Sequence, residues 1–385
     1  MKNLEKMLSK NYKYINKRIP MATNGVHFVN DSEEFDGLIL SQLIRFVGTY
    51  RTQYKSKQVP IYFHFTHRNL EIKDKLVYVI FECICYSLRK EGRKVHILWK
   101  PKDTIITHGI FNSPLRLLSD SDYRDEKVYM EKFENDISPT HYRTLIKVQD
   151  LSTNYLGRSI EDMAYSLKLL GLTDEVIDNI SEVVEELVGN AGEHVNSDCL
   201  VDIDITSGLT KKEDKSSSED EYLGINIAIV SFSETLFGEA IKEKIITNTY
   251  NAPRYTELSQ IHDRHMLLIQ DSEEDYEEYF WNIAALQDKI SGRRNLDPTG
   301  GTGLTVLINS LQKQAHGEFC YIMSGNKIIY FHKDYIKYDQ NHWLPFNKDN
   351  DFYDHLPEDK VLWKSHVYLP GTAYNLNFIM KREEK

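Results

Sequence analysis

Residues 174–195 carry the apolar repeat of a long amphipathic helix. Thr173 can cap its start, and Asp174 and Glu175 place acidic groups at the positive end of the helix dipole. Four polar residues follow one another at intervals of four, which aligns them along one stripe: Glu182, Glu186, Asn190 and His194. A solvated helix shows the same spacing, so the stripe alone is compatible with a structural role.

A glycine-rich segment precedes a second helical pattern. Gly300, Gly301, Thr302, Gly303 and Leu304 open an apolar-periodic stretch that Gly317 ends. Backbone N–H groups at such a helix start bind phosphate, and glycine permits the close approach that this requires. Neither a GK[ST] phosphate loop nor a GxGxxG fingerprint is present. The segment therefore predicts a phosphate site of another type.

The two motifs together resemble the GHKL superfamily of ATPases (gyrase, the ninety-kilodalton heat-shock chaperone, histidine kinases and MutL). The string from Glu186 to His194 is similar to the family's N box, and the glycine segment about 110 residues later is similar to its second glycine box. The resemblance implies an α+β fold in residues 159–380: a two-layer α/β sandwich with a mixed, mostly antiparallel sheet and helices on one face. The segment 369–378 resembles the family's final strand, which commonly opens with Gly-Thr.

The resemblance also implies roles for residues. Asn190 would be a Mg²⁺ ligand and Glu186 the general base of ATP hydrolysis. His194 would lie near the phosphates or the nucleotide lid, whereas Glu185 points away from the stripe. The backbone from Gly300 to Leu304 would hold the phosphates. Arg294 and its neighbour Arg293 either reach the phosphates or are solvated loop arginines.

One family position differs. GHKL proteins place an Asp after the strand between the two motifs, and that Asp accepts a hydrogen bond from the adenine amino group. In the family this Asp begins an Asp-x-Gly-x-Gly motif. Here the strand 225–230 is followed by Ser231 at the position of the Asp, and Ser233 and Thr235 stand at the positions of the two glycines. A hydroxyl still accepts one hydrogen bond but lacks the charge of a carboxylate. We therefore expect weak or altered adenine recognition.

The N-terminal part is organised differently. Residues 1–20 are predicted to form a polar helical arm, 21–110 a small α/β domain, and 111–158 a connector with one or two short helices. The small domain has the order strand, helix, strand, which loosely resembles a STAS domain. In signalling STAS domains a phosphorylated Ser or Thr opens the helix after this strand. Here Thr66 is the only hydroxyl near that position, so a docking role is favoured over a phosphoswitch.

Composition narrows the partners. A formal net charge of −11 makes nucleic acid an improbable main partner. Apolar stretches long enough to span a bilayer are missing from the sequence, so no membrane association is expected. The four cysteines form no CxxC pair, which favours buried thiols in the cytoplasm. The docking role of the N-terminal domain predicts a protein partner bound there, and a homodimer is a further possibility.

These observations predict an ATP- and Mg²⁺-dependent conformational switch that hydrolyses ATP slowly. Two alternatives stay open at this stage. One is a non-catalytic interaction module of GHKL fold, favoured by Ser231. The other is a protein kinase of the anti-sigma or histidine-kinase type that phosphorylates a separate partner.

Overall fold

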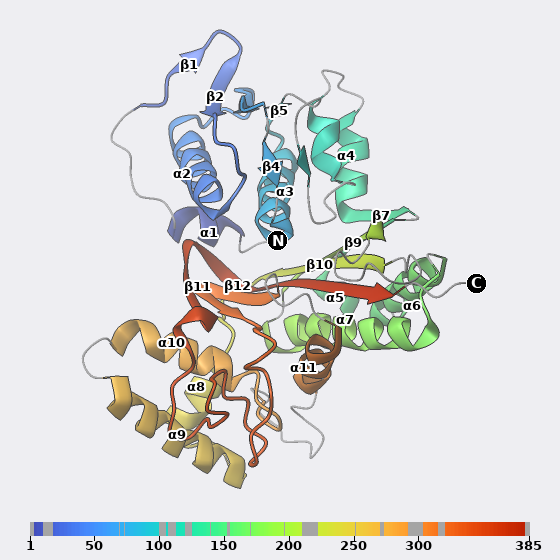
Figure 1. The fold of residues 1–385 in the computed structure, drawn as a ribbon. Helices are drawn as coiled ribbons and strands as arrows, with labels where there is room; N and C mark the ends of the chain where they lie inside the picture. The colour runs from blue at the N-terminus through green and yellow to red at the C-terminus, as the bar shows by residue number, and fades with distance from the viewer. Residues whose placement is uncertain are drawn as a thin grey trace.

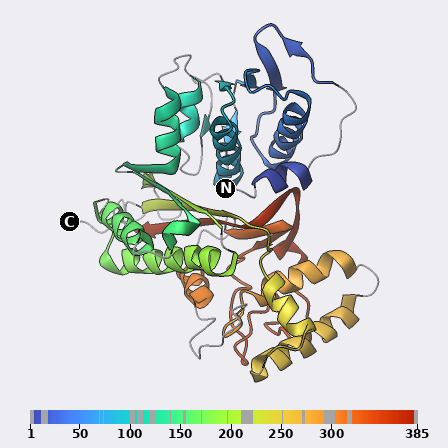
Figure 2. The same cartoon turned by 180° about the vertical axis from the view of Figure 1, so that it is seen from behind.

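The computed structural model describes residues 4–381, except for 11–17, 69, 73, 100–104, 107–112, 120–124, 139, 152–154, 170, 196, 210–221, 251, 270–272, 292–302 and 315–319. Its helices and strands make a mixed α+β protein. Three layers are visible in Figures 1 and 2: an N-terminal α/β region, a central sheet, and a layer of helices on the far side of that sheet.

The N-terminal region is built on a four-stranded sheet of order β1-β2-β3-β5. Its strands are β1 (Met21–Ala22), β2 (Gly25–Asn30), β3 (Ile61–Phe65) and β5 (Val95–Trp99). The last three are parallel, and helices α2 (Gly37–Gln53) and α3 (Lys75–Lys90) connect them. The Asp36 and Asp74 carboxylates cap these helices by accepting backbone N–H groups of the first turn.

Short elements complete this region. Helix α1 (Leu4–Lys10) precedes the sheet, and the two-residue strands β4 (Glu71–Ile72) and β6 (Ile105–Ile106) pair with each other. A 3₁₀ helix, η1 (Pro114–Leu118), and α4 (Asp125–Glu134) lead to the central sheet.

The central sheet has six strands in the order β11-β12-β10-β9-β8-β7, and every described pair is antiparallel. The strands are β7 (Asn135–Ser138), β8 (His141–Ile146), β9 (Cys199–Leu209), β10 (Tyr222–Phe232), β11 (Tyr321–Tyr330) and β12 (Leu362–Lys381). Side chains alternate along each strand, so neighbouring residues of one strand belong to different layers.

One face of this sheet is covered by helices from the C-terminal two-thirds of the chain (Figure 1). They are α5 (Val148–Leu151), α6 (Tyr155–Leu169), α7 (Asp174–Val195) and α11 (Gly303–Gln314). Three further helices lie beside them, at one end of the sheet: α8 (Glu239–Ile246), α9 (Pro253–Ile269) and α10 (Glu273–Ala284). The 3₁₀ helix η2 (Asp359–Val361) leads into β12.

The other face of the central sheet is also covered. Val230 of β10, Ala373 of β12 and Met323 of β11 belong to the same hydrophobic cluster as residues of α1, α2 and α3. The two-layer sandwich with helices on one face, which the family resemblance implied, is therefore extended here by a third layer. The N-terminal region packs on the sheet rather than beside it (Figure 2).

Two stretches differ from the sequence-based boundaries. The segment 111–158, predicted as a connector, contains β7 and β8, two strands of the central sheet. The polar arm predicted for residues 1–20 contains α1, whose Leu4, Met7 and Leu8 are buried in the cluster beneath the sheet. In both places a few apolar residues among polar ones contact a distant part of the chain, which local periodicity does not reveal.

Candidate functional site

Helix α7 forms the first wall of a pocket. The Thr173 hydroxyl accepts the backbone N–H of Val176 at 3.3 Å, so this residue caps the helix as its sequence predicts. Leu187 is buried in the core beneath the helix and borders the pocket, which Glu186 and Asn190 also line. The Asn190 amide Nδ2 donates to the Glu186 carboxylate at 3.1 Å. Because this bond uses an N–H of the Asn190 amide, the carbonyl oxygen Oδ1 of the same side chain is left to bind a ligand or a metal ion.

The floor of the pocket is formed by β10 and β12. Ser231 and Thr372 face each other across this antiparallel pair, and both line the pocket together with Ile229 and Tyr374. Gly371, beside Thr372, has a φ of +101°, and a Cβ at this residue would lie 2.2 Å from the Ser231 carbonyl oxygen. Glycine is therefore required for β12 to approach this closely.

The third wall comes from the segments flanking the helices at the end of the sheet. Gly238, Ala240 and Ile241 line it at the start of α8, and residues Ile290 and Ser291 line it after α10. Tyr255 of α9 fixes this last segment, because its hydroxyl donates to the Ser291 carbonyl at 2.7 Å and accepts the Ser291 N–H at 2.9 Å.

Lys244 strengthens the same anchor. Its ammonium donates to the Ser291 carbonyl at 2.7 Å, and burial lowers the pKa of this lysine. A carbonyl that accepts from both a lysine and a tyrosine is held in one position. The wall opposite α7 is therefore preorganised rather than a free loop.

The pocket enclosed by these walls has a volume of about 950 Å³ when the open space at its mouth is included. Its lining is mostly apolar, and its polar residues are Glu186, Asn190, Ser231, Thr235, Ser291 and Thr372, besides the hydroxyl of Tyr374. Leu304, at the start of α11, also lines it. An apolar cavity with a few convergent polar groups is the usual form of a ligand site.

The structure describes some of the site residues predicted from the sequence, and others lie outside its described part. Glu186, Asn190, Ser231 and Leu304 come together in this one pocket. Gly303 begins α11, whereas Gly300, Gly301, Thr302 and Arg294 lie outside the described residues. The backbone of His194 continues α7, and its side chain is likewise outside the described part.

Several lining residues were not singled out from the sequence as site residues. Thr372 and Tyr374 lie in the segment that resembles the family's last strand, so the Gly-Thr pair was a usable signal for them. Gly238 carried a weaker signal. Its φ is +84°, and a Cβ there would lie 2.3 Å from the Trp281 carbonyl oxygen. The close approach joins the α8 and α10 walls, which no local pattern predicts.

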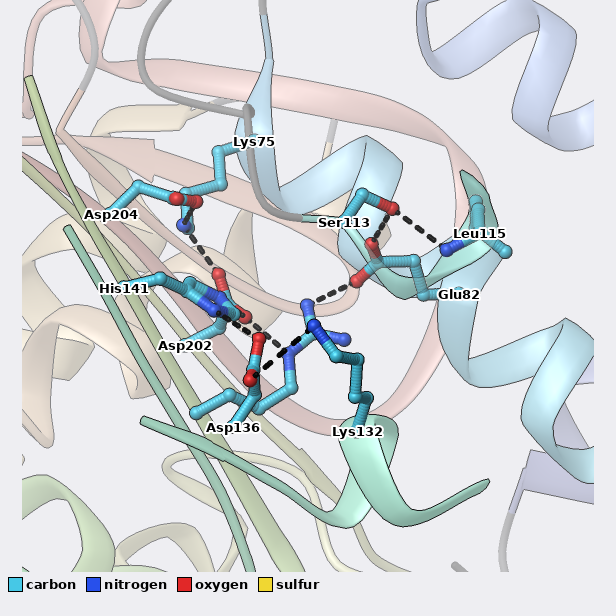
Figure 3. A network of polar contacts seen from close by, with 10 residues as sticks. Lys75, Glu82, Ser113, Leu115, Lys132, Asp136, His141, Asp202 and Asp204 are labelled. Atoms are coloured by element: carbon cyan, nitrogen blue, oxygen red, sulfur yellow. Dashed lines mark hydrogen bonds and ion pairs between the residues drawn. The ribbon is translucent and has the colours of Figure 1, made fainter. Parts of the chain in front are cut away.

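A second polar cluster lies on the opposite face of the same sheet, between α3 and strands β8 and β9 (Figure 3). Asp202 is at its centre. Its carboxylate pairs with Lys75 of α3 and with Arg143 of β8, and it also contacts His141 Nε2 at 3.0 Å. Lys75 pairs in addition with Asp204 at 2.5 Å. All five side chains are buried.

Glu82 extends this cluster along α3. Its carboxylate accepts hydrogen bonds from the Arg143 guanidinium and from the Ser113 hydroxyl. Ser113 Oγ in turn accepts the backbone N–H of Leu115 at 3.1 Å. The chain of contacts thus joins η1, α3 and the central sheet (Figure 3).

The pKa values of the cluster follow from burial and from its charges. Burial opposes the charged form of Asp202, yet Arg143, Lys75 and His141 hold the pKa of this carboxylate well below its usual range. Burial likewise disfavours the His141 cation, but the Asp202 and Asp136 carboxylates raise the pKa of His141 to about 9. For Glu82, burial dominates and raises the pKa despite Arg143.

Within the described residues, His141, Asp202 and Asp204 are close enough for a shared metal ion. The Lys75 ammonium, however, pairs with both aspartates. The Lys75 ammonium therefore supplies the positive charge that a metal ion would otherwise bring to these carboxylates. We interpret the cluster as an ion-pair network rather than a metal site.

Comparison with known proteins gives no match. No family model matches the sequence, and neither a curated protein nor a solved structure is similar to it at a significant level. Of the helices in the described part, none is long and apolar enough to cross a membrane. The functional argument consequently rests on the pocket and on the sequence motifs that line it.

Proposed function

We propose that the pocket between α7 and the β10–β12 floor binds ATP together with Mg²⁺, as the GHKL resemblance implies, and that the protein is a nucleotide-dependent switch with slow hydrolysis. The observation that carries the proposal is the convergence of Glu186, Asn190, Ser231 and Leu304, which are distant in sequence, on one cavity. They come from three separate stretches of the chain: α7, the end of β10 and the start of α11.

The polar groups fit a magnesium-bound triphosphate. Magnesium prefers oxygen ligands, and the Asn190 carbonyl oxygen is the atom left available by the bond from its amide nitrogen to Glu186. A bound Mg²⁺ would neutralise part of the triphosphate charge. Leu304 of α11 lines the same cavity, so the start of this helix would offer backbone N–H groups and a positive helix end to the phosphates.

Glu186 fits the role of general base. It lies one helical turn before Asn190 and contacts its amide at 3.1 Å, so both groups act on the same end of a ligand. A carboxylate held there can orient a water molecule and accept its proton as the water attacks the terminal phosphorus, while the bond from that phosphorus to the bridging oxygen breaks and ADP leaves. The proton then resides on Glu186 until solvent removes it.

The decisive experiment separates binding from turnover. A fluorescent ATP analogue is titrated into the full chain with and without Mg²⁺. Asn190→Ala should abolish the magnesium-dependent part of the affinity, since it removes the amide oxygen. Glu186→Ala should keep binding and lower phosphate release by on the order of a hundredfold. Glu185→Ala, an exposed neighbour on the same helix, is the matched control and should change neither quantity.

A non-catalytic nucleotide-binding module is the second candidate, and Ser231 in place of an acid favours it. Binding that requires Asn190 without any phosphate release from the wild type would select this candidate. Unchanged affinity in Asn190→Ala would contradict both. Labelled phosphate that appears on a co-expressed protein and depends on Glu186 would instead indicate a kinase.

A further inference from the structure

Ser231 differs from the serines around it in its hydrogen bonding. Ser197 donates to the Phe232 carbonyl at 2.5 Å, Ser324 donates to the Gly371 carbonyl at 2.7 Å, and Ser233 donates to the Thr235 carbonyl. Ser231 Oγ, although only 4% of the residue is exposed, has no hydrogen-bond partner among the residues that the structure describes. A buried hydroxyl without a partner is unfavourable, and native proteins rarely retain one without a reason.

The unpartnered hydroxyl lines the pocket, and a ligand there can satisfy it. Thr372 lies directly across the strand pair and adds a second hydroxyl to the same floor. The close approach of Gly371 to the Ser231 carbonyl, where a Cβ would lie at 2.2 Å, fixes the distance between the two strands. The two hydroxyls are therefore presented by a rigid surface.

The floor suits the uncharged part of a ligand. The backbone N–H groups of β10 are committed to ladders with β9 and β12, and the neighbouring side chains at Ile229 and Tyr374 are largely apolar. Phosphates need cations or available N–H donors, which the floor does not offer. The charged phosphates of a nucleotide would therefore lie near Asn190 and the start of α11. Its heterocyclic base would then contact the floor.

We propose that Ser231 and Thr372 recognise the base of a purine nucleotide by neutral hydrogen bonds and do not distinguish adenine from guanine. This inference rests on the proposed nucleotide function. A hydroxyl can accept a hydrogen bond from the exocyclic amine of adenine or donate one to the carbonyl oxygen of guanine. A carboxylate can only accept, so it would favour the amine and repel the carbonyl oxygen. The ligand class is thus purine nucleoside triphosphates.

The test compares two nucleotides on the full chain. Ribose-labelled fluorescent ATP and GTP are titrated in the presence of Mg²⁺, and the ratio of their Kd values is the readout. We expect the two Kd values of the wild type to agree within about threefold, as neutral hydroxyls accommodate either base edge. Ser231→Asp should shift the ratio toward ATP by on the order of tenfold or more, because the added carboxylate disfavours guanine.

Two further variants guard against misfolding of Ser231→Asp. Ser231→Ala and Thr372→Val each remove one hydroxyl, and each should weaken ATP and GTP by a similar factor while circular dichroism stays unchanged. A wild type that binds ATP a hundredfold more tightly than GTP, or the reverse, would overturn the inference and leave the proposed function intact. Absence of binding for both nucleotides would overturn the proposed function itself.

Discussion

On the α7 side of the central sheet, β9 contributes Cys199, Val201 and Ile203 to an apolar core, whereas on the α3 side the same strand contributes Asp202 and Asp204. The first face encloses a cavity with sparse polar groups, whereas at β8 and β9 the second face is closed by buried charges that neutralise one another. Apolar side chains can pack around a cavity large enough for a ligand. Buried charges cannot, because each charge must keep its partner in contact.

The largest effect should come from Arg143. The substitution Arg143→Met removes the guanidinium shared by Asp202 and Glu82 and leaves two buried carboxylates without it. Loss of one partner from a buried network destabilises by about 3–5 kcal/mol. Denaturant unfolding monitored by circular dichroism measures the change.

Lys168→Met is the matched control for this variant. Lys168 pairs with Asp174 on the surface, where both side chains are more than half exposed. Exposed pairs contribute less than about 1 kcal/mol. If Arg143→Met were as mild as this control, the contrast between the two faces of the sheet would be lost.

The next effect depends on pH. The pKa of His141 is raised to about 9 in the folded protein, above its ordinary value of 6.5. Protonated His141 therefore stabilises the fold fully below pH 6.5, and this contribution is lost as pH rises through 9. The total is on the order of 3 kcal/mol. Unfolding free energies measured from pH 6 to pH 10 should fall less steeply in His141→Gln than in the wild type, and parallel curves would refute this assignment.

A smaller effect is expected at the edge of the same interface. The Tyr321 hydroxyl of β11 donates to both carboxylate oxygens of Asp74, at 2.9 and 2.8 Å, and Asp74 also caps α3. Tyr321→Phe should destabilise by about 1.5–3 kcal/mol, the range for hydrogen bonds to charged groups. Nucleotide affinity should not change, since Tyr321 does not line the pocket. Tyr353→Phe, on the surface, provides the control.

The mildest change concerns the apolar face. Ile227 of β10 is fully buried in the core beneath α7. Removing one methylene group in Ile227→Val should lower the free energy of unfolding by about 0.5–1.5 kcal/mol, with no dependence on pH. A loss as large as that of Arg143→Met would show that the apolar face is no more tolerant than the charged one.

Local patterns predicted the elements whose signals are contained within them. The cap at Thr173, the polar stripe and the end of α7 at Val195 all followed from one stretch of sequence. The order strand, helix, strand expected for the small domain is likewise present as β3, α3 and β5. The spacing of Glu186 and Asn190 likewise identified one wall of the pocket.

The missed elements depend on distant partners. In β8, His141 and Arg143 look like solvent-facing residues, but Arg143 is buried by contacts to Asp202 and Glu82, which lie 59 and 61 residues away. No window of local sequence contains both partners of such a pair. The alternating Asp202 and Asp204 within an apolar strand were a usable clue, because acids at that spacing share one face.

The alternation in β9 has a consequence for folding. A slip of one residue against β10 would turn Asp202 and Asp204 toward the apolar helices and direct Val201 and Ile203 at the Lys75 ammonium. Such a misaligned sheet would bury unpaired carboxylates, which is far more costly than misplacing one aliphatic residue for another. The acids therefore specify strand alignment, and a chain that lacked them would choose between two near-equivalent pairings.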